Sequence, residues 1–98
     1  MLAKNAISKI RELEHELRAM GVLSLSLFGS VARNEGRADS DVDVAVTVDH
    51  DSGFSLLDLV AVKNRLSDHL HQPVDILTEP IRNSRLKNNI EKDRMRAF

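Results

Sequence analysis

Hydrophobic and polar residues alternate along two short segments of the chain, and this pattern predicts two β-strands. In residues 23–28, leucines alternate with serines, so one face of the strand is apolar and the other is polar. In residues 42–48, four valines mark one face and Asp, Ala and Thr mark the other. Residues 74–77 read Val-Asp-Ile-Leu and predict a third strand.

Apolar residues at helical spacing predict three helices around these strands. We expect one continuous helix over residues 7–20, which stops at Gly21. A second helix is expected over residues 56–70 and is ended by Pro73. A third is opened by Pro80 and carries the apolar side chains Ile81, Leu86 and Ile90.

The order of these elements predicts one α/β domain that spans residues 1–98. A chain of 98 residues is long enough for a single hydrophobic core. With a short terminal strand at residues 95–98, the strands form a small mixed β-sheet. We expect the helices to pack on one face of this sheet and the acidic side chains to lie on the other.

Composition gives expectations about location. The sequence has no stretch that approaches the roughly 20 apolar residues of a membrane span, and no N-terminal apolar run typical of a signal peptide. It also has no cysteine, which excludes a disulfide framework and a thiolate metal site. We therefore expect a cytoplasmic protein with no membrane association.

The acidic residues of the strands are the strongest sign of chemistry. Asp41 and Asp43 are two residues apart, so in a strand their side chains share a face and their Cα atoms lie about 7 Å apart. Two carboxylates on a half-buried face repel each other unless a cation lies between them. Asp75 repeats this feature in the third strand. Three carboxylates suit Mg²⁺ or Mn²⁺ better than zinc; the alternative is a set of solvated acids on edge strands.

A glycine–serine pair directly follows the first strand. Gly29 lets the backbone approach a ligand closely, and Ser30 is a favoured N-cap for a short helix over residues 31–33. Free N–H groups at the start of a helix attract phosphate oxygens. On the second predicted helix, Lys63 and Arg65 are further candidates for contacting a phosphate. An ordinary turn and a solvated helix face are the alternatives.

Taken together, these residues resemble a known catalytic motif. Gly29-Ser30, ten residues, Asp41-x-Asp43 and a later Asp75 resemble the DNA polymerase beta-type nucleotidyltransferase superfamily. More narrowly, the chain resembles the minimal nucleotidyltransferases, the MNT domains of bacteria and archaea. The resemblance implies the palm-like nucleotidyltransferase fold and transfer of AMP from ATP, with Mg²⁺, or Mn²⁺ in its place, as cofactor.

The resemblance also implies two groups of site residues. The first binds the nucleotide phosphates and comprises Gly29, Ser30, Arg33 and Ser40. The second binds the metal ions and carries the catalysis, and comprises Asp41, Asp43 and Asp75. Ser40 is implied to act through a local hydrogen bond, and Asp75 to help activate the acceptor hydroxyl. Where relatives often have Ala-Arg-Gly, this chain has Asn34 in place of the glycine. Because Asn tolerates left-handed backbone, we expect the turn to be preserved.

The predicted domain leaves little surface for selecting an acceptor, and the resemblance offers an explanation. Stand-alone MNT proteins commonly pair with a HEPN-domain protein encoded by a neighbouring gene. In such pairs the HEPN protein is an RNase toxin, and the MNT protein is an antitoxin that transfers AMP to a toxin tyrosine. The leading hypothesis is therefore a hetero-oligomer in which the phenol oxygen attacks the α-phosphorus of ATP and pyrophosphate leaves.

Three other functions stay open. AMP could pass to a small molecule, with a partner chain supplying substrate recognition. The protein could also neutralise its partner by binding alone. Nucleic-acid binding rests only on the segment after residue 78, which holds six basic and three acidic residues. The net charge of −1 and the absence of Trp and Tyr argue against it.

Overall fold

A mixed β-sheet organises the fold, as the sequence pattern predicts. The computed structural model describes residues 1–37 and 40–98. Within these residues the strand order is β3-β2-β1-β4, with β2 parallel to β3 and antiparallel to β1, and β1 antiparallel to β4. The elements are α1 (Ala3–Glu12), α2 (Glu14–Ala19), β1 (Val22–Phe28), α3 (Gly29–Ala32), β2 (Val42–Val48), the 3₁₀ helix η1 (His50–Ser52), α4 (Leu56–Leu70), β3 (Val74–Thr78), α5 (Ser84–Asp93) and β4 (Met95–Arg96).

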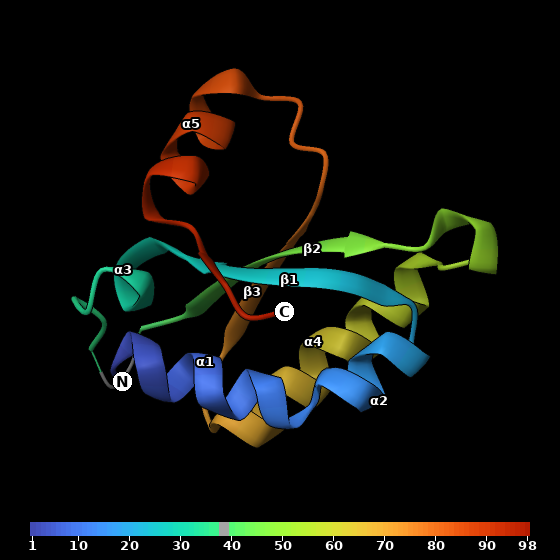
Figure 1. The fold of residues 1–98 in the computed structure, drawn as a ribbon, viewed down its shortest axis with the longest axis horizontal. Helices are drawn as coiled ribbons and strands as arrows, with labels where there is room; N and C mark the ends of the chain where they lie inside the picture. The colour runs from blue at the N-terminus through green and yellow to red at the C-terminus, as the bar shows by residue number, and fades with distance from the viewer. Residues whose placement is uncertain (38–39) are drawn as a thin grey trace.

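The helices divide between the two sides of the sheet. Figure 1 shows α1, α2 and α4 on one side, and α5, in orange and red, on the other. The first three helices confirm the expected layer, and α5 departs from it. No helix in the two described ranges is long and apolar enough to cross a membrane. The position of α5 makes it a wall of the opposite face, on which the acidic side chains lie.

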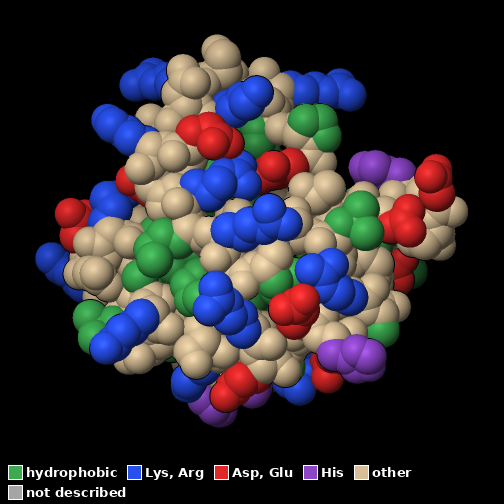
Figure 2. Space-filling view, viewed as in Figure 1, with side chains coloured by type: hydrophobic (Ala, Val, Ile, Leu, Met, Phe, Trp, Pro, Cys, Tyr) green, Lys and Arg blue, Asp and Glu red, His purple; other side chains and the backbone are tan. Residues whose placement is uncertain are grey.

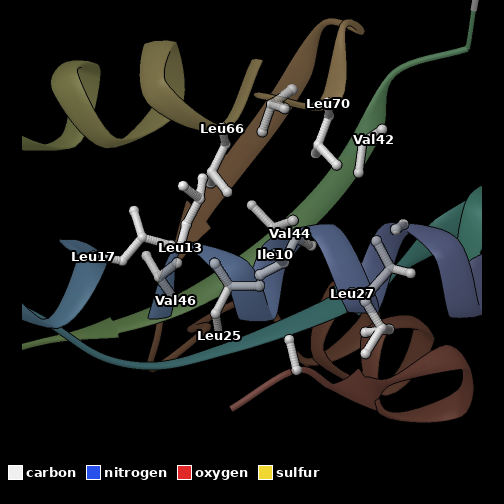
Figure 3. Packing of buried hydrophobic residues seen from close by; sticks show 14 of the residues in the cluster. Ile10, Leu13, Leu17, Leu25, Leu27, Val42, Val44, Val46, Leu66 and Leu70 are labelled. Carbon is white, nitrogen blue, oxygen red and sulfur yellow. The ribbon is translucent and has the colours of Figure 1, made fainter. Parts of the chain in front are cut away.

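The hydrophobic core lies between the sheet and the layer of α1, α2 and α4 (Figure 3). It includes the apolar faces of the predicted strands and helices, with these side chains buried: Ile10, Leu13, Leu17, Leu25, Leu27, Val42, Val44, Val46, Leu66 and Leu70. Burial of a Leu, Ile or Val side chain contributes about 1.5–3 kcal/mol each. Because these valines face the helices, the residues between them on β2 must face the other side of the sheet.

The first predicted helix is broken into two. α1 ends at Glu12 and α2 begins at Glu14, with Leu13 between them at φ −96° and ψ 1°. The N–H of Leu13 donates to the carbonyl of Ile10 (2.9 Å), and helical geometry resumes one residue later. The apolar stripe survives the break, because Leu13 and Leu17 are both buried.

Capping residues, not prolines, set the boundaries of two helices. α4 ends at Leu70, as predicted, and its C-cap His71 takes a left-handed conformation (φ 56°), two residues before Pro73. The predicted start of the third helix at Pro80 is wrong. α5 begins only after Asn83, whose side chain accepts a hydrogen bond from the N–H of Leu86 (3.1 Å). Ile81 therefore lies outside the helix. Asn and Asp caps satisfy the free N–H groups of a helix start, so they fix its first residue more directly than a nearby proline does.

A bulge near the start of β1 changes which residues face the core. The pairing with β2 shifts between Val22 and Ser24, so Leu23 is 48% exposed while Val22 is fully buried. Leu23 was expected on the apolar face, and that prediction is wrong. A bulge inserts one residue, which reverses the side-chain alternation before it. From Leu25 onward the predicted apolar side chains Leu25 and Leu27 are buried, and Ser26 between them is buried as well.

Arg94 ties α5 to the sheet. Its guanidinium donates from Nη1 to Oγ of Ser26 on β1 (3.1 Å), and from Nη2 to Glu79 and Glu91. Just beyond it, the chain continues along β1, where the N–H of Ala97 donates to the carbonyl of Leu25 (2.9 Å). This confirms the expected terminal strand. One arginine thus joins β1, the end of β3 and the end of α5.

We expect Arg94→Met to lower the free energy of unfolding by about 2 kcal/mol, because it removes charge-assisted hydrogen bonds and leaves a partly buried Glu79 carboxylate without its cation. Urea denaturation followed by circular dichroism measures the change. Arg82→Met is the matched control, since Arg82 is exposed and a surface substitution usually costs less than about 0.5 kcal/mol. Equal losses in both variants would contradict the role of Arg94.

Candidate active site

Two of the predicted catalytic acids are direct neighbours in the sheet. The parallel register of β2 and β3 places Asp43 opposite Asp75. Val42 and Val44, which flank Asp43 on β2, are fully buried in the core. Because side chains alternate along a strand, both carboxylates project from the face away from α1 and α4. Asp43 is half-buried, whereas Asp75 lies exposed on the edge strand of the described sheet.

Asp41 lies just before β2 and, like Asp75, is exposed to solvent. Its negative charge acts on Asp43. Burial raises the pKa of Asp43, the negative charges of Asp75 and Asp41 raise it further, and Arg33 lowers it. The three carboxylates are therefore near enough to repel one another, and a cation would relieve that repulsion.

The donor set fits Mg²⁺ by its chemistry. All three side chains are carboxylates, the hard oxygen ligands that Mg²⁺ prefers, and the repulsion at Asp43 favours a bound cation. In residues 1–37 and 40–98, no three or more His, Cys, Asp or Glu side chains are arranged closely enough to hold a metal ion. Asp43 and Asp75, which lie opposite each other on β2 and β3, would hold an ion together, and a third carboxylate would join only after a side-chain movement.

Gly29 connects β1 to α3 directly beside Asp43. The pair Phe28 and Asp43 closes the β1–β2 ladder, and Gly29 follows with φ +77°. A Cβ atom at this position would overlap Oδ2 of Asp43 and lie 3.1 Å from its Cγ. The need for glycine is therefore twofold: the backbone conformation is left-handed, and the carboxylate occupies the space a side chain would take.

The two serines of the predicted phosphate site differ in their surroundings. Ser30 is the second residue of α3, not its N-cap, and the prediction of a serine cap is wrong. The chain turns one residue earlier, so the N–H of Arg33 already bonds to the carbonyl of Gly29 (3.2 Å). Ser40 makes the local hydrogen bond that the resemblance implied, since its Oγ accepts from the N–H of Arg37 (2.8 Å).

Arg33 follows α3 at the edge of a cleft. Its Nε donates to Glu35 (2.9 Å) and its Nη1 to Asp93 at the end of α5. The cleft has a volume of about 520 Å³ and lies between α3 and α5. Its lining residues are Phe28, Gly29, Arg33, Leu86, Asn89, Ile90, Lys92 and Asp93. A nucleotide that contacts Gly29 would therefore also meet α5.

The prediction that two cations of α4 contact a phosphate is wrong. Lys63 and Arg65 belong to the helix layer behind the sheet, and Arg65 pairs there with Glu16 of α2. They cannot reach the face that carries Asp43. Lys92 of α5 lines the cleft instead. Sequence patterns miss this residue, because only the return of α5 across the sheet brings it near Gly29.

The turn at Asn34 is preserved and has a second use. Asn34 adopts φ 59°, the left-handed conformation expected for it. Its Oδ1 also accepts a hydrogen bond from the N–H of Ala3 (2.8 Å), at the start of α1. This long-range cap, over 31 residues, joins the loop after α3 to the first helix and has no signal in the sequence.

On the face shown in Figure 2, the charges of the described residues do not form a nucleic-acid footprint. Figure 2 shows Lys and Arg side chains interspersed with Asp and Glu over the face that carries α5 and the C-terminal end. Several arginines are paired, among them Arg94 with Glu79 and Arg18 with Glu14. Mixed signs of charge are typical of a solvated surface, whereas nucleic-acid binding favours an unpaired basic stripe.

A family comparison agrees with the site. The profile of the nucleotidyltransferase domain matches residues 10–97. This chain belongs to that nucleotidyltransferase family. A protein from Methanocaldococcus jannaschii named "Putative protein adenylyltransferase" is 42% identical to this nucleotidyltransferase over 73 residues. The match covers 74% of this chain and 72% of the relative.

Solved structures with the same fold extend the comparison. One described as a minimal nucleotidyltransferase superposes on this nucleotidyltransferase with a TM-score of 0.79 and 29% identity, covering 97% of this chain and 95% of the other. A chain of the complex between tri-AMPylated Shewanella oneidensis HEPN toxin and MNT antitoxin superposes with a TM-score of 0.67 and 18% identity. The match covers 99% of this chain and 72% of the other. The predicted α/β nucleotidyltransferase fold is thereby confirmed.

Proposed function

We propose that this nucleotidyltransferase transfers AMP from ATP to a tyrosine hydroxyl of a partner HEPN-domain RNase toxin, and so acts as its antitoxin. The observation that carries the proposal is the pair Asp43 and Asp75 beside Gly29, at the entrance of a cleft. The name of the M. jannaschii relative supports a protein acceptor. The HEPN–MNT complex, which shares the fold, supports the kind of partner.

Each predicted site residue has a role in this proposal. The backbone at Gly29 and Ser30 would approach the triphosphate, because glycine leaves no side chain in the way. Arg33 would exchange one of its carboxylate partners for a phosphate oxygen, and Ser40 would hold the loop that leads to the acids. Mg²⁺, for which Asp41, Asp43 and Asp75 would be the ligands, would neutralise negative charge on the triphosphate when bound.

In the proposed reaction a phenol oxygen attacks the α-phosphorus of ATP. A new P–O bond forms, the bond to the β-phosphate breaks, and pyrophosphate leaves. Asp75 would accept the phenol proton, and its exposure on the edge strand, where a second protein can reach it, supports this role. The chain would contribute mainly by positioning the reactants and neutralising charge. Since the reaction needs ATP, a cytoplasmic location is part of the proposal.

The proposal is tested with the HEPN-domain protein encoded by the neighbouring gene. It is incubated with this chain, Mg²⁺ and ATP labelled with ³²P at either the α or the γ position. We expect the HEPN protein to take up the α label and not the γ label, and its intact mass to rise in steps of one AMP. Peptide mapping should place the added mass on tyrosine, and EDTA should prevent the transfer.

Other outcomes separate the alternative functions. Stable co-purification of the two proteins without added mass would point to neutralisation by binding alone. Consumption of ATP with no labelled protein would point to a small-molecule acceptor. Uptake of the γ label would contradict nucleotidyl transfer itself, because a kinase reaction moves the terminal phosphate.

A further inference from the structure

α5 presents an apolar side chain that the hydrophobic core does not use. Leu86 is 37% exposed, and it lines the cleft together with Ile90, one helical turn later. Residues four apart on a helix share a face, and because Ile90 is buried, Leu86 supplies the exposed part of this apolar strip along the cleft wall. An apolar strip in a cleft that also holds charged residues indicates a ligand with one apolar part.

The two ends of the cleft differ in chemistry. One end holds Gly29, Arg33 and Lys92, and Asp93 fixes α5 there through its ion pair with Arg33. Leu86 precedes Lys92 by six residues, which corresponds to about 9 Å along a helix. The cleft therefore passes from a cationic end to an apolar end over a length comparable with that of a nucleotide.

The residues of the site follow one another across the sheet, from the edge strand β3 toward α5. Asp75 lies on the edge strand, Asp43 on the next strand, and Gly29 at the end of β1, beyond which the cleft opens toward α5. An acceptor that approaches Asp75 would leave the α5 side free. The part of the nucleotide that extends beyond Gly29 would then lie against α5.

Asn89 lies in the cleft wall between the two ends. We propose that Leu86, supported by the buried Ile90, packs against the purine base of the nucleotide and that the amide of Asn89 selects adenine. An amide offers an acceptor and a donor side by side, which match the amino group and the adjacent ring nitrogen of adenine. Guanine reverses this donor–acceptor order, so the amide selects adenine when the bound complex holds it in one orientation. The inference rests on the proposed function, which places the triphosphate at Gly29.

The first test is Asn89→Asp, because a carboxylate only accepts hydrogen bonds and matches the ring N–H and amino group of guanine. Isothermal titration calorimetry with Mg²⁺ gives the Kd of ATP and of GTP. We expect the unaltered chain to prefer ATP, and Asn89→Asp to shift the ratio of the two Kd values toward GTP by about tenfold. The matched control is Asn88→Asp, which adds the same charge to the same helix outside the cleft lining and should leave the ratio unchanged.

A second variant tests the apolar strip separately from the phosphates. Leu86→Ala should weaken ATP binding about fivefold, as expected for lost contact with one or two methylene groups. It should leave binding of inorganic tripolyphosphate unchanged, since this probe has no base. Leu86 is partly exposed, so the fold should tolerate its truncation.

The outcomes distinguish the inference from the proposed function. If Asn89→Asp keeps the unaltered ratio while ATP still binds, the role of Asn89 is wrong and the proposed function stands. If Leu86→Ala weakens ATP and tripolyphosphate equally, the base does not lie on α5. If the unaltered chain binds neither nucleotide with Mg²⁺, both proposals are overturned.

Discussion

Asp43→Asn is expected to lower nucleotide transfer by at least about a thousandfold, which corresponds to roughly 4 kcal/mol of lost transition-state stabilisation. Asp43 is the acid that lies beside both Asp75 and the Gly29 turn. An amide is nearly the same size as the carboxylate but has no charge to hold a divalent ion. Initial rates of α-label transfer, measured at saturating Mg²⁺ and ATP, give the size of the loss.

The same substitution should leave the fold intact. Burial and the charges of Asp75 and Asp41 disfavour the ionised form of Asp43, as its raised pKa shows, so a neutral amide relieves repulsion. The melting temperature without metal should therefore equal or exceed that of the unaltered chain. Asp68→Asn is the matched control, because Asp68 is an exposed residue of α4, behind the sheet. Near-normal transfer by Asp43→Asn would contradict the assigned role.

Gly29→Ala is expected to lower the free energy of unfolding by about 2–4 kcal/mol and to reduce transfer strongly. Left-handed backbone costs a residue with a Cβ about 1–2 kcal/mol. The new methyl group would also overlap the Asp43 carboxylate, so either the turn or the carboxylate must move. Urea denaturation gives the stability, and the rate of α-label transfer gives the effect on the site.

Gly53→Ala separates the two causes. Gly53 has φ +78°, almost the same as the +77° of Gly29, but a Cβ there meets nothing within 4 Å. Both variants therefore lose stability to the same left-handed backbone conformation. Only in Gly29→Ala does the new methyl group also overlap the Asp43 carboxylate. The difference in stability between them measures the contact with Asp43. Equal destabilisation of the two variants, with transfer retained by both, would refute the close packing of Gly29 against the acid.

The local elements were predictable because each depends on near neighbours in the chain. Alternating valines define β2, and the helical stripe of α4 is confirmed over residues 56–70. Errors arose where a single local feature overrides the pattern. The bulge at Leu23 and the Asn83 cap at the start of α5 are such features. A periodic pattern averages over several residues, so it does not resolve a change that one residue causes.

By itself, the sequence determined the family motif and the side of the strand from which Asp43 and Asp75 project, since the side-chain period of a strand is two. The tertiary structure alone decided that Asp43 stands beside Asp75 and that α5 crosses to the same face, where Leu86 and Asn89 line a cleft with Gly29. Leu86 and Asn89 are 57 and 60 positions from Gly29 in the chain, and Asp43 and Asp75 lie on separate strands. Contacts at such separation depend on strand register and helix placement, which result from packing of the whole core and leave no local periodicity to read.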